Sequence, residues 1–183
     1  MKIVSIDIET SGLDENNSQI LSLGAVIEDT LSDVEVENLP SYYRRVSFDT
    51  LKGEIFAINM NKELITEIFE NKDNKNIDIE NLADDFTLWL NYYLPNEKIT
   101  IAGKNFAGFD KKFLDKINFF SRIKHHYTYL DPAPLYFNPI TDEKLPSLDD
   151  CLKRAKIEKQ VSHNALEDAQ DVVRVLRYAF KNQ

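Results

Sequence analysis

The stretch Lys-Ile-Val-Ser-Ile-Asp-Ile at residues 2–8 places the strongest constraint on the fold of this chain. Its mostly apolar, β-branched side chains predict a buried strand inside a sheet, where charged residues are rare. Asp7 and Glu9 stand two residues apart at the end of this strand, so their carboxylates project from the same face. Two such charges repel one another and resist ionisation away from water unless a cation lies between them. The strand therefore predicts a metal site at one end of a sheet.

The ligands that the chain can supply decide which metal fits. An all-carboxylate set favours Mg²⁺ or Mn²⁺, whereas zinc prefers nitrogen and sulfur ligands. Cys151 is the only cysteine, which excludes a thiolate-rich zinc site and an internal disulfide. Taken alone, Asp-x-Glu at a strand end is more often a capped turn with solvated acids. The metal assignment therefore depends on acidic residues elsewhere in the chain.

Asp110 is the first of these. It follows a strand-like run at residues 99–103 and lies in the first turns of a helical pattern at residues 106–117. The apolar positions of that pattern predict a core-facing side, which Asp110 borders. The alternative interpretation is an acid that merely stabilises the positive end of a helix dipole.

The third acidic position lies in a C-terminal helix that apolar residues predict over 164–181. Asn164 and Glu167 have the spacing of a capping box, which gives Glu167 a structural role. Asp168 lies one turn into the helix, and His163 falls on the loop before it. A histidine can take a proton from water near neutral pH. A lone loop histidine is more often a surface residue, so this assignment too depends on the other blocks.

Length and composition predict one domain spanning residues 1–183. The chain is 43% hydrophobic, has no linker rich in proline or glycine, and can bury one sizeable core. The sequence shows no secretion signal and no apolar run that could cross a membrane, so we expect a soluble, cytoplasmic protein. Cys151 falls on an apolar helical face, which indicates core packing.

The net charge of −9 is unusual for a protein that binds nucleic acid. Proteins that grip long duplexes present a basic face, because phosphate neutralisation supplies most of their affinity. Bound metal ions would supply local positive charge that the net charge does not count. Short single strands, or delivery by a partner protein, therefore fit better than tight duplex binding. Four lysines around the second acidic block are candidates for steering a backbone, although helix-surface lysines are usually only solvated: Lys104, Lys111, Lys112 and Lys116.

Hydrophobic periodicity predicts strands near 2–8, 20–28, 34–46, 99–103 and 126–131, and helices near 60–70, 79–94, 106–117, 147–156 and 164–181. Residues 71–76 are expected to form a charged polar loop. Three successive strands followed by alternating helices and strands predict an α/β fold, with a mixed sheet flanked by helices on both faces.

The key residues lie in three short blocks: Asp7-Ile8-Glu9-Thr10, Asn105-Phe106-Ala107-Gly108-Phe109-Asp110 and His163-Asn164-Ala165-Leu166-Glu167-Asp168-Ala169. Their order, spacing and context resemble the blocks of the DEDDh 3′→5′ exonucleases, a proofreading-subunit-like family that includes RNase T and oligoribonuclease. The resemblance runs from residue 3 to about residue 178. It implies a ribonuclease H-like domain with a central five-stranded sheet.

The resemblance also implies roles for individual residues. Asp7 would bridge two divalent ions, Glu9 and Asp168 would help to hold the first, and Asp110 would support the second. His163 would be the general base. The His-x₄-Asp spacing of the family favours Asp168 over its neighbour Asp171. Residues matching the family's nucleotide-binding positions are Thr10, Ser11, Gly12 and Leu13, with Leu13 as a wedge against the terminal base, and Asn105, which would orient the second block. The alternative for Leu13 is an ordinary loop anchor.

The function favoured by these residues is a metal-dependent 3′→5′ exonuclease that releases 5′-mononucleotides from single-stranded DNA or RNA ends by two-metal-ion hydrolysis. An RNA-specific enzyme, oligoribonuclease-like or RNase T-like, is one alternative. A non-catalytic module that binds nucleic acid or a polymerase is another, but all five key residues are present. The partners considered are strand 3′ ends and a polymerase or other replication or repair protein, with no membrane. The sequence leaves sugar preference and oligomeric state open.

Overall fold

A central sheet organises the computed structural model, which describes residues 1–159 and 162–181. Its six strands run in the order β4-β3-β2-β1-β5-β6. They are β1 (Lys2–Thr10), β2 (Ile20–Asp29), β3 (Ser41–Ser47), β4 (Asn76–Asp78), β5 (Ile99–Ala102) and β6 (His125–Leu130). Strands β1, β2 and β3 are antiparallel neighbours, whereas β5 runs parallel to β1, β6 to β5 and β4 to β3. The mixed α/β sheet is confirmed, and the acidic strand β1 lies inside it.

The predicted count of five strands is wrong, because β4 lies where the sequence indicated the end of a polar loop. Arg45 of β3 explains this short strand: its Nε donates to the Asn76 side chain at 3.1 Å, and Nη1 contacts Glu67 at 2.9 Å. Three residues held by side-chain contacts leave no periodic signal in the sequence.

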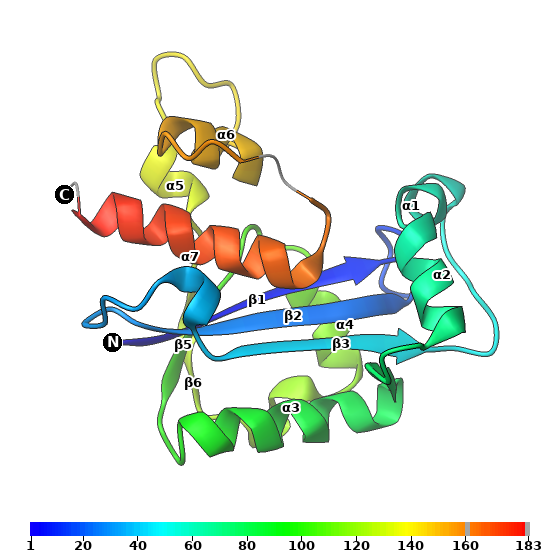
Figure 1. Cartoon of the computed structure of the whole chain (residues 1–183). Helices are drawn as coiled ribbons and strands as arrows, with labels where there is room; N and C mark the ends of the chain where they lie inside the picture. Colours follow the sequence, from blue (N-terminus) through cyan, green and yellow to red (C-terminus); the bar gives the residue numbers. More distant parts are fainter. Residues whose placement is uncertain (160–161, 182–183) are drawn as a thin grey trace.

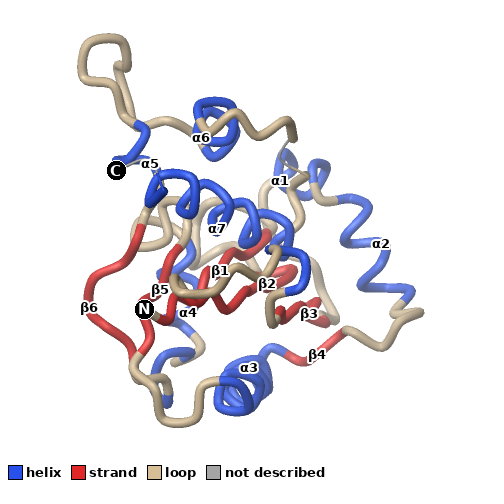
Figure 2. The backbone as a smooth tube through the Cα atoms, turned by 60° about the vertical axis from the view of Figure 1, so that its left-hand side comes forward, coloured by secondary structure: helices blue, strands red, loops and turns tan. Residues whose placement is uncertain are grey.

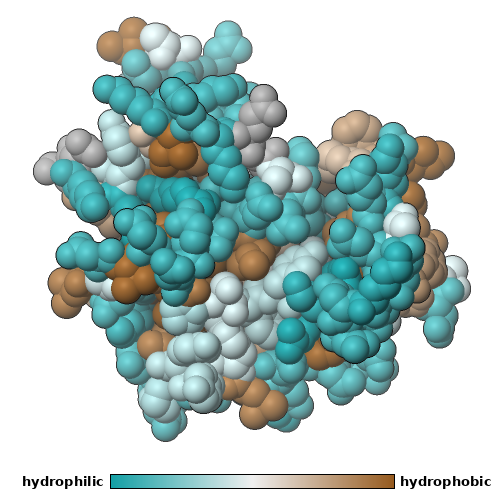
Figure 3. All heavy atoms as spheres, viewed as in Figure 1, coloured by the Kyte–Doolittle hydropathy of each residue, from teal (hydrophilic) through white to brown (hydrophobic). Residues whose placement is uncertain are grey.

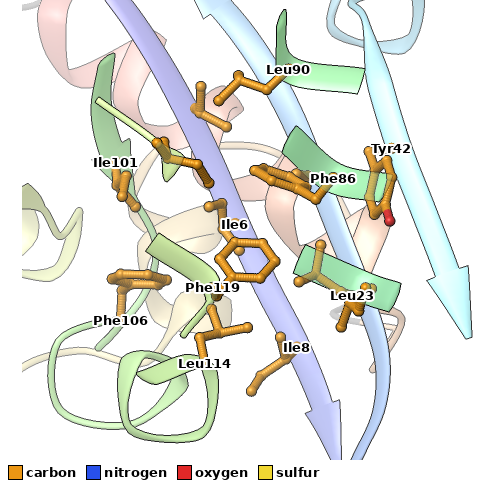
Figure 4. Close-up of a cluster of buried hydrophobic side chains, with 14 of the residues drawn as sticks. Ile6, Ile8, Leu23, Tyr42, Phe86, Leu90, Ile101, Phe106, Leu114 and Phe119 are labelled. Carbon is orange, nitrogen blue, oxygen red and sulfur yellow. The ribbon is translucent and has the colours of Figure 1, made fainter. Parts of the chain in front are cut away.

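Helices cover both faces of the sheet, as predicted (Figure 1). They are α1 (Ile55–Met60), α2 (Lys62–Glu70), α3 (Ile79–Tyr93), α4 (Asp110–Lys116), α5 (Ala133–Tyr136), α6 (Leu148–Arg154) and α7 (Ala165–Lys181), with 3₁₀ turns η1 (Val36–Asn38) and η2 (Phe119–Arg122). Figure 2 shows α7 across β1 and β2 on the face opposite α3. On the α3 side, buried residues of the sheet, α3 and α4 form the larger core (Figure 4).

Two predicted elements have different bounds. The strand expected over 34–46 divides into η1 and β3, with Pro40 between them, because proline cannot donate to a ladder. The helix expected over 106–117 begins at Asp110, after a turn in which the Gly108 and Phe109 amides donate to the Asn105 carbonyl. No described helix has the length and apolar character needed to cross a membrane.

Gly24 sets how closely α7 approaches the sheet. A Cβ atom at this position would come within 2.2 Å of the Ala165 carbonyl carbon and the Leu166 nitrogen. Gly24 also pairs with Asp7 in the β1–β2 ladder. Its lack of a side chain therefore lets the first turn of α7 lie against the sheet at the level of Asp7.

Candidate active site

Strand β1 carries the first two acids of the site. Asp7 and Glu9 point to one face of the sheet; Asp7 is partly buried and Glu9 is buried. Asn61, between α1 and α2, hydrogen-bonds the Glu9 side chain and donates from Nδ2 to the Thr10 carbonyl at 3.2 Å. Asn61 thus fixes both the Glu9 carboxylate and the end of the strand that presents it.

Asp110 joins this pair from the start of α4. It is 3% exposed, and its Oδ1 accepts a hydrogen bond from the Ile8 amide at 3.1 Å. The β1–β5 pairing covers only Ile3 to Ser5, so beyond it the Ile8 amide needs another partner. Asp110 supplies that partner and is thereby held between the first two acids.

Helix α7 contributes the fourth acid. Asn164 caps the helix, because its Oδ1 accepts from the amides of Leu166 at 3.1 Å and Glu167 at 3.2 Å. The Glu167 amide thus makes the N-cap contact of the predicted capping box, while its carboxylate hydrogen-bonds Ser162 and lies 3.3 Å from the Lys159 ammonium. Asp168 lies in the first turn and is 7% exposed.

His163 lies exposed on the loop before α7, with a left-handed backbone (φ 51°). One of its ring nitrogens and one carboxylate oxygen each from Glu9 and Asp168 all lie within 4.8 Å of one another. The three sequence blocks therefore converge, and the histidine is at the solvent side of the acids.

All four carboxylates have a raised pKa, and burial is the largest cause for each. Burial, followed by the charges of Asp110, Asp168 and Glu9, raises the pKa of Asp7 well above its usual range. Burial and the Asp168 charge raise the pKa of Glu9 to about 7. Burial raises the pKa of Asp110 to about 7, and burial with the Asp171 charge does the same for Asp168. Such a set becomes fully ionised at neutral pH only if positive charge is supplied to it.

The side chains present suit a hard divalent cation. The Asp168 Oδ1 atom is buried and, within the described part of the chain, has no hydrogen-bond partner. The group of Glu9, His163 and Asp168 offers converging oxygen and nitrogen atoms, and Asp7 and Asp110 add carboxylates beside it. Oxygen-rich sites of this kind favour Mg²⁺ or Mn²⁺.

The predicted nucleotide loop, Thr10 to Leu13, directly follows the acids. The Thr10 hydroxyl donates to the Gly12 carbonyl at 2.8 Å, and the buried Ser11 hydroxyl accepts from the Gln19 amide at 2.8 Å. These side chains therefore shape the loop, while Leu13 is 73% exposed and free to contact a ligand.

Leu13, Ile55 and Phe56 form an apolar edge at the predicted nucleotide loop. Glu54 joins the loop to α1 by accepting from the Leu13 amide at 2.8 Å. Ile55 and Phe56 are both exposed, and Figure 3 shows apolar side chains gathered where α1 lies. Three exposed apolar side chains are therefore available to a ligand beside the predicted nucleotide loop.

Asn105 lies at the turn before α4, with a left-handed backbone (φ 56°) and its amide donating to Asp131 at 2.9 Å. It therefore helps to set the turn that delivers Asp110. Asn61, by contrast, is a site residue that sequence reasoning missed. In the sequence, Asn61 is only a polar residue at a break in a helical pattern. The structure shows that it is buried and hydrogen-bonds the Glu9 side chain.

Comparisons with known proteins agree with this geometry. The sequence profile of the RNase T exonuclease family matches residues 4–176. No curated protein sequence gives a significant match to this chain.

Solved structures share the fold at low sequence identity. The nuclease domain of 3′hExo, described as a DEDDh family member bound to rAMP, aligns with a TM-score of 0.69 and 16% identity, over 99% of this chain and 92% of that one. Exonuclease I of E. coli, in a zinc-bound complex with single-stranded DNA, gives 0.69 and 17%, over 100% of this chain and 41% of that one. Exonuclease I of Methylocaldum szegediense gives 0.68 and 16%, again over 100% and 41%. These similarities show a ribonuclease H-like fold, and this chain spans less than half the length of the exonuclease I chains.

Proposed function

This chain belongs to the RNase T exonuclease family, and we propose that it is a metal-dependent 3′→5′ exonuclease, formed by one domain over residues 1–183, that releases 5′-mononucleotides from single-stranded DNA or RNA. The observation that carries the proposal is the convergence of Asp7, Glu9, Asp110 and Asp168 from three separate segments around a buried oxygen without a hydrogen-bond partner in the described chain. Folding brings these charges together against their repulsion, which fits a function in binding cations.

The four carboxylates would hold two Mg²⁺ or Mn²⁺ ions. When bound, such ions stabilise the charge that develops on the phosphoryl and leaving oxygens. Asp110 and Glu9 keep their orientation through the Ile8 amide and Asn61, so the ligand set is preorganised by the fold. Preorganisation lowers the cost of assembling the site when substrate binds.

His163 would act as the general base. Its exposed ring lies at the solvent side of Glu9 and Asp168, where a water approaching the scissile phosphate would enter. A ring nitrogen would accept the proton of that water, and the exposed loop would let the proton pass to solvent.

The loop from Thr10 to Leu13 would receive the terminal nucleotide. Leu13, with Ile55 and Phe56 across the same edge, offers apolar surface for a base, which has an aromatic face. Asn105 would act indirectly, by setting the turn before Asp110.

The test is cleavage of 5′-labelled single-stranded DNA and RNA of equal length, each with Mg²⁺, with Mn²⁺ or with chelator. We expect a ladder that shortens from the 3′ end, its loss with chelator, and its return when Mg²⁺ is restored. The Asp168→Asn variant is the control for contaminating nuclease. Binding without cleavage would support a non-catalytic module instead, and undiminished cleavage after exhaustive chelation would overturn the two-ion mechanism. The relative rates on RNA and DNA decide the sugar preference.

A further inference from the structure

A groove of about 580 Å³ opens beside the carboxylates and is lined by both acidic and basic side chains. Asp7, Asp168 and His163 line it, together with Asp149 of α6. The basic residues of the lining include Lys104, two residues after the end of β5, and Lys153 on α6. Lysines in a groove that also presents metal-binding carboxylates point to an anionic ligand.

The lysines that line the groove differ in whether a carboxylate already pairs with them. Lys159, which also lines the groove, contacts Glu167 at 3.3 Å and the buried Asp171 at 3.1 Å, so it anchors its loop to α7. In the described ranges, the one ion pair of Lys153 is with Asp149 at 2.5 Å on its own helix, where both side chains are exposed. Among the residues that the structure describes, Lys104 forms no ion pair and no side-chain hydrogen bond, although it is only partly exposed. Its ammonium is thus available to a ligand.

The structure also separates Lys104 from the other lysines that the sequence indicated. Lys111 pairs with Asp115, and Lys116 donates to Asn16. Lys112 is exposed on α4 and is not among the residues that line the groove. Of these four lysines, Lys104 alone faces the groove in the described structure.

We propose that the backbone of the single strand lies in this groove, with Lys104 and Lys153 each contacting a phosphate. This inference rests on the proposed function and adds a direction to it: phosphates near Lys104 and α6, and bases toward the apolar edge of Leu13, Ile55 and Phe56. The positions of the helices support this division, because α6, which carries Lys153, and α1, which carries Ile55 and Phe56, lie on different sides of the end of β1 (Figure 1). In a chain of net charge −9, a few well-placed lysines keep the strand's phosphates away from the acids.

The test measures how strand binding depends on salt. Fluorescence anisotropy would follow a 5′-labelled single-stranded oligonucleotide in Ca²⁺ over a series of KCl concentrations, with the oligonucleotide checked for integrity afterwards. Each phosphate contact contributes about 0.7 to the log–log slope for single strands. Lys104→Gln should therefore lower the slope by about 0.7 and weaken binding about tenfold at low salt, and Lys104→Gln with Lys153→Gln should lower the slope by about 1.4.

Two matched variants make the result specific. Lys98→Gln removes the same charge at the opposite end of β5, on an exposed residue outside the groove, and should leave the slope unchanged. Lys104→Arg keeps the charge and should keep the slope. An unchanged slope in Lys104→Gln, or an equal loss in Lys98→Gln, would overturn the proposal. The slope is measured without turnover, so a strand that binds through Lys104 but is not cleaved would count against the nuclease mechanism and not against the path.

Discussion

Buried acids occur in two settings in this protein. In one, basic side chains of the chain neutralise the carboxylate; in the other, no basic side chain of the described residues does so. Asp171 and Glu28 are buried beside basic side chains: Asp171 contacts Arg174 and Lys159, and Glu28 contacts Arg177 at 2.6 Å. The four acids at the end of β1 lie beside other carboxylates instead. Within residues 1–159 and 162–181, no lysine or arginine forms an ion pair with any of them.

Helix α7 carries one acid of each kind. Asp168 and Asp171 are three residues apart, so they lie on neighbouring parts of one helix face. Asp171 meets Lys159 and Arg174, whereas Asp168 meets Glu9 and His163. The chain thus neutralises one buried carboxylate itself and leaves the other for a cation from solution. Asp171 should therefore matter for stability and Asp168 for activity.

The largest expected effect is the loss of activity when one of the acids without a basic partner among the described residues is replaced. Asp7→Asn or Asp168→Asn should lower turnover by more than about 10³-fold, because ligands are lost from ions whose charge stabilisation is worth several kcal/mol. Thermal melting in chelator should show an intact fold with an equal or higher Tm, since a repulsive charge is gone. Single-turnover cleavage gives the rate, and activity within about tenfold of wild type would remove that residue from the metal site.

Replacing His163 tests whether this exposed residue takes the proton from the attacking water. His163→Ala should slow single-turnover cleavage by about 10²–10⁴-fold, the range of a positioned general base. The Mg²⁺ concentration for half-maximal activity should change little if the ring is a base and not a ligand. A rate near wild type would make His163 an ordinary loop residue, and a large rise in the Mg²⁺ requirement would make it a ligand.

Asp171, which basic side chains neutralise, should affect stability more than activity. Asp171→Asn leaves Lys159 and Arg174 without their shared carboxylate, so we expect the free energy of unfolding to fall by about 3 kcal/mol. Urea unfolding followed by circular dichroism measures this, with Asp168→Asn as the matched control on the same helix. Equal destabilisation of the two variants would show that the two acids do not differ in the way that the structure indicates.

The pH dependence of stability should show, without any mutation, that the acids at the end of β1 have no basic partners. Glu9, Asp110 and Asp168 have a pKa raised to about 7, so between about pH 4 and 7 the folded protein holds protons that the unfolded chain releases. Stability in chelator should therefore fall as pH rises through this window. At pH 8, Mg²⁺ at 100 times its Kd should restore about 2.7 kcal/mol.

The control for this linkage is Glu9→Gln, which should flatten the decline because one raised pKa is removed. Thermal melts at pH 5, 6, 7 and 8, with and without Mg²⁺, provide the measurement. Stability that rises with pH in chelator would mean that the cluster is compensated within the protein.

Local sequence patterns were enough to predict several elements of this protein. The apolar run at residues 2–8 predicted β1 and its two acids, and helical spacing predicted α3 and α7 nearly to their ends. The motif order was enough to indicate the exonuclease family, which the profile match confirms. These features are readable because strand and helix periodicity, and residues fixed relative to them, are properties of neighbouring residues.

The contacts between charged side chains became visible only in the folded chain. Strand β4 depends on Arg45, and the orientation of Glu9 depends on Asn61. The close packing of α7 against the sheet depends on Gly24. The structure also showed that Lys104 faces the groove without a partner among the described residues, while Lys159 is already paired. These contacts join residues far apart in the chain, and burial and electrostatic energy depend on distances in space. A single sequence contains no periodic signal from which such distances follow.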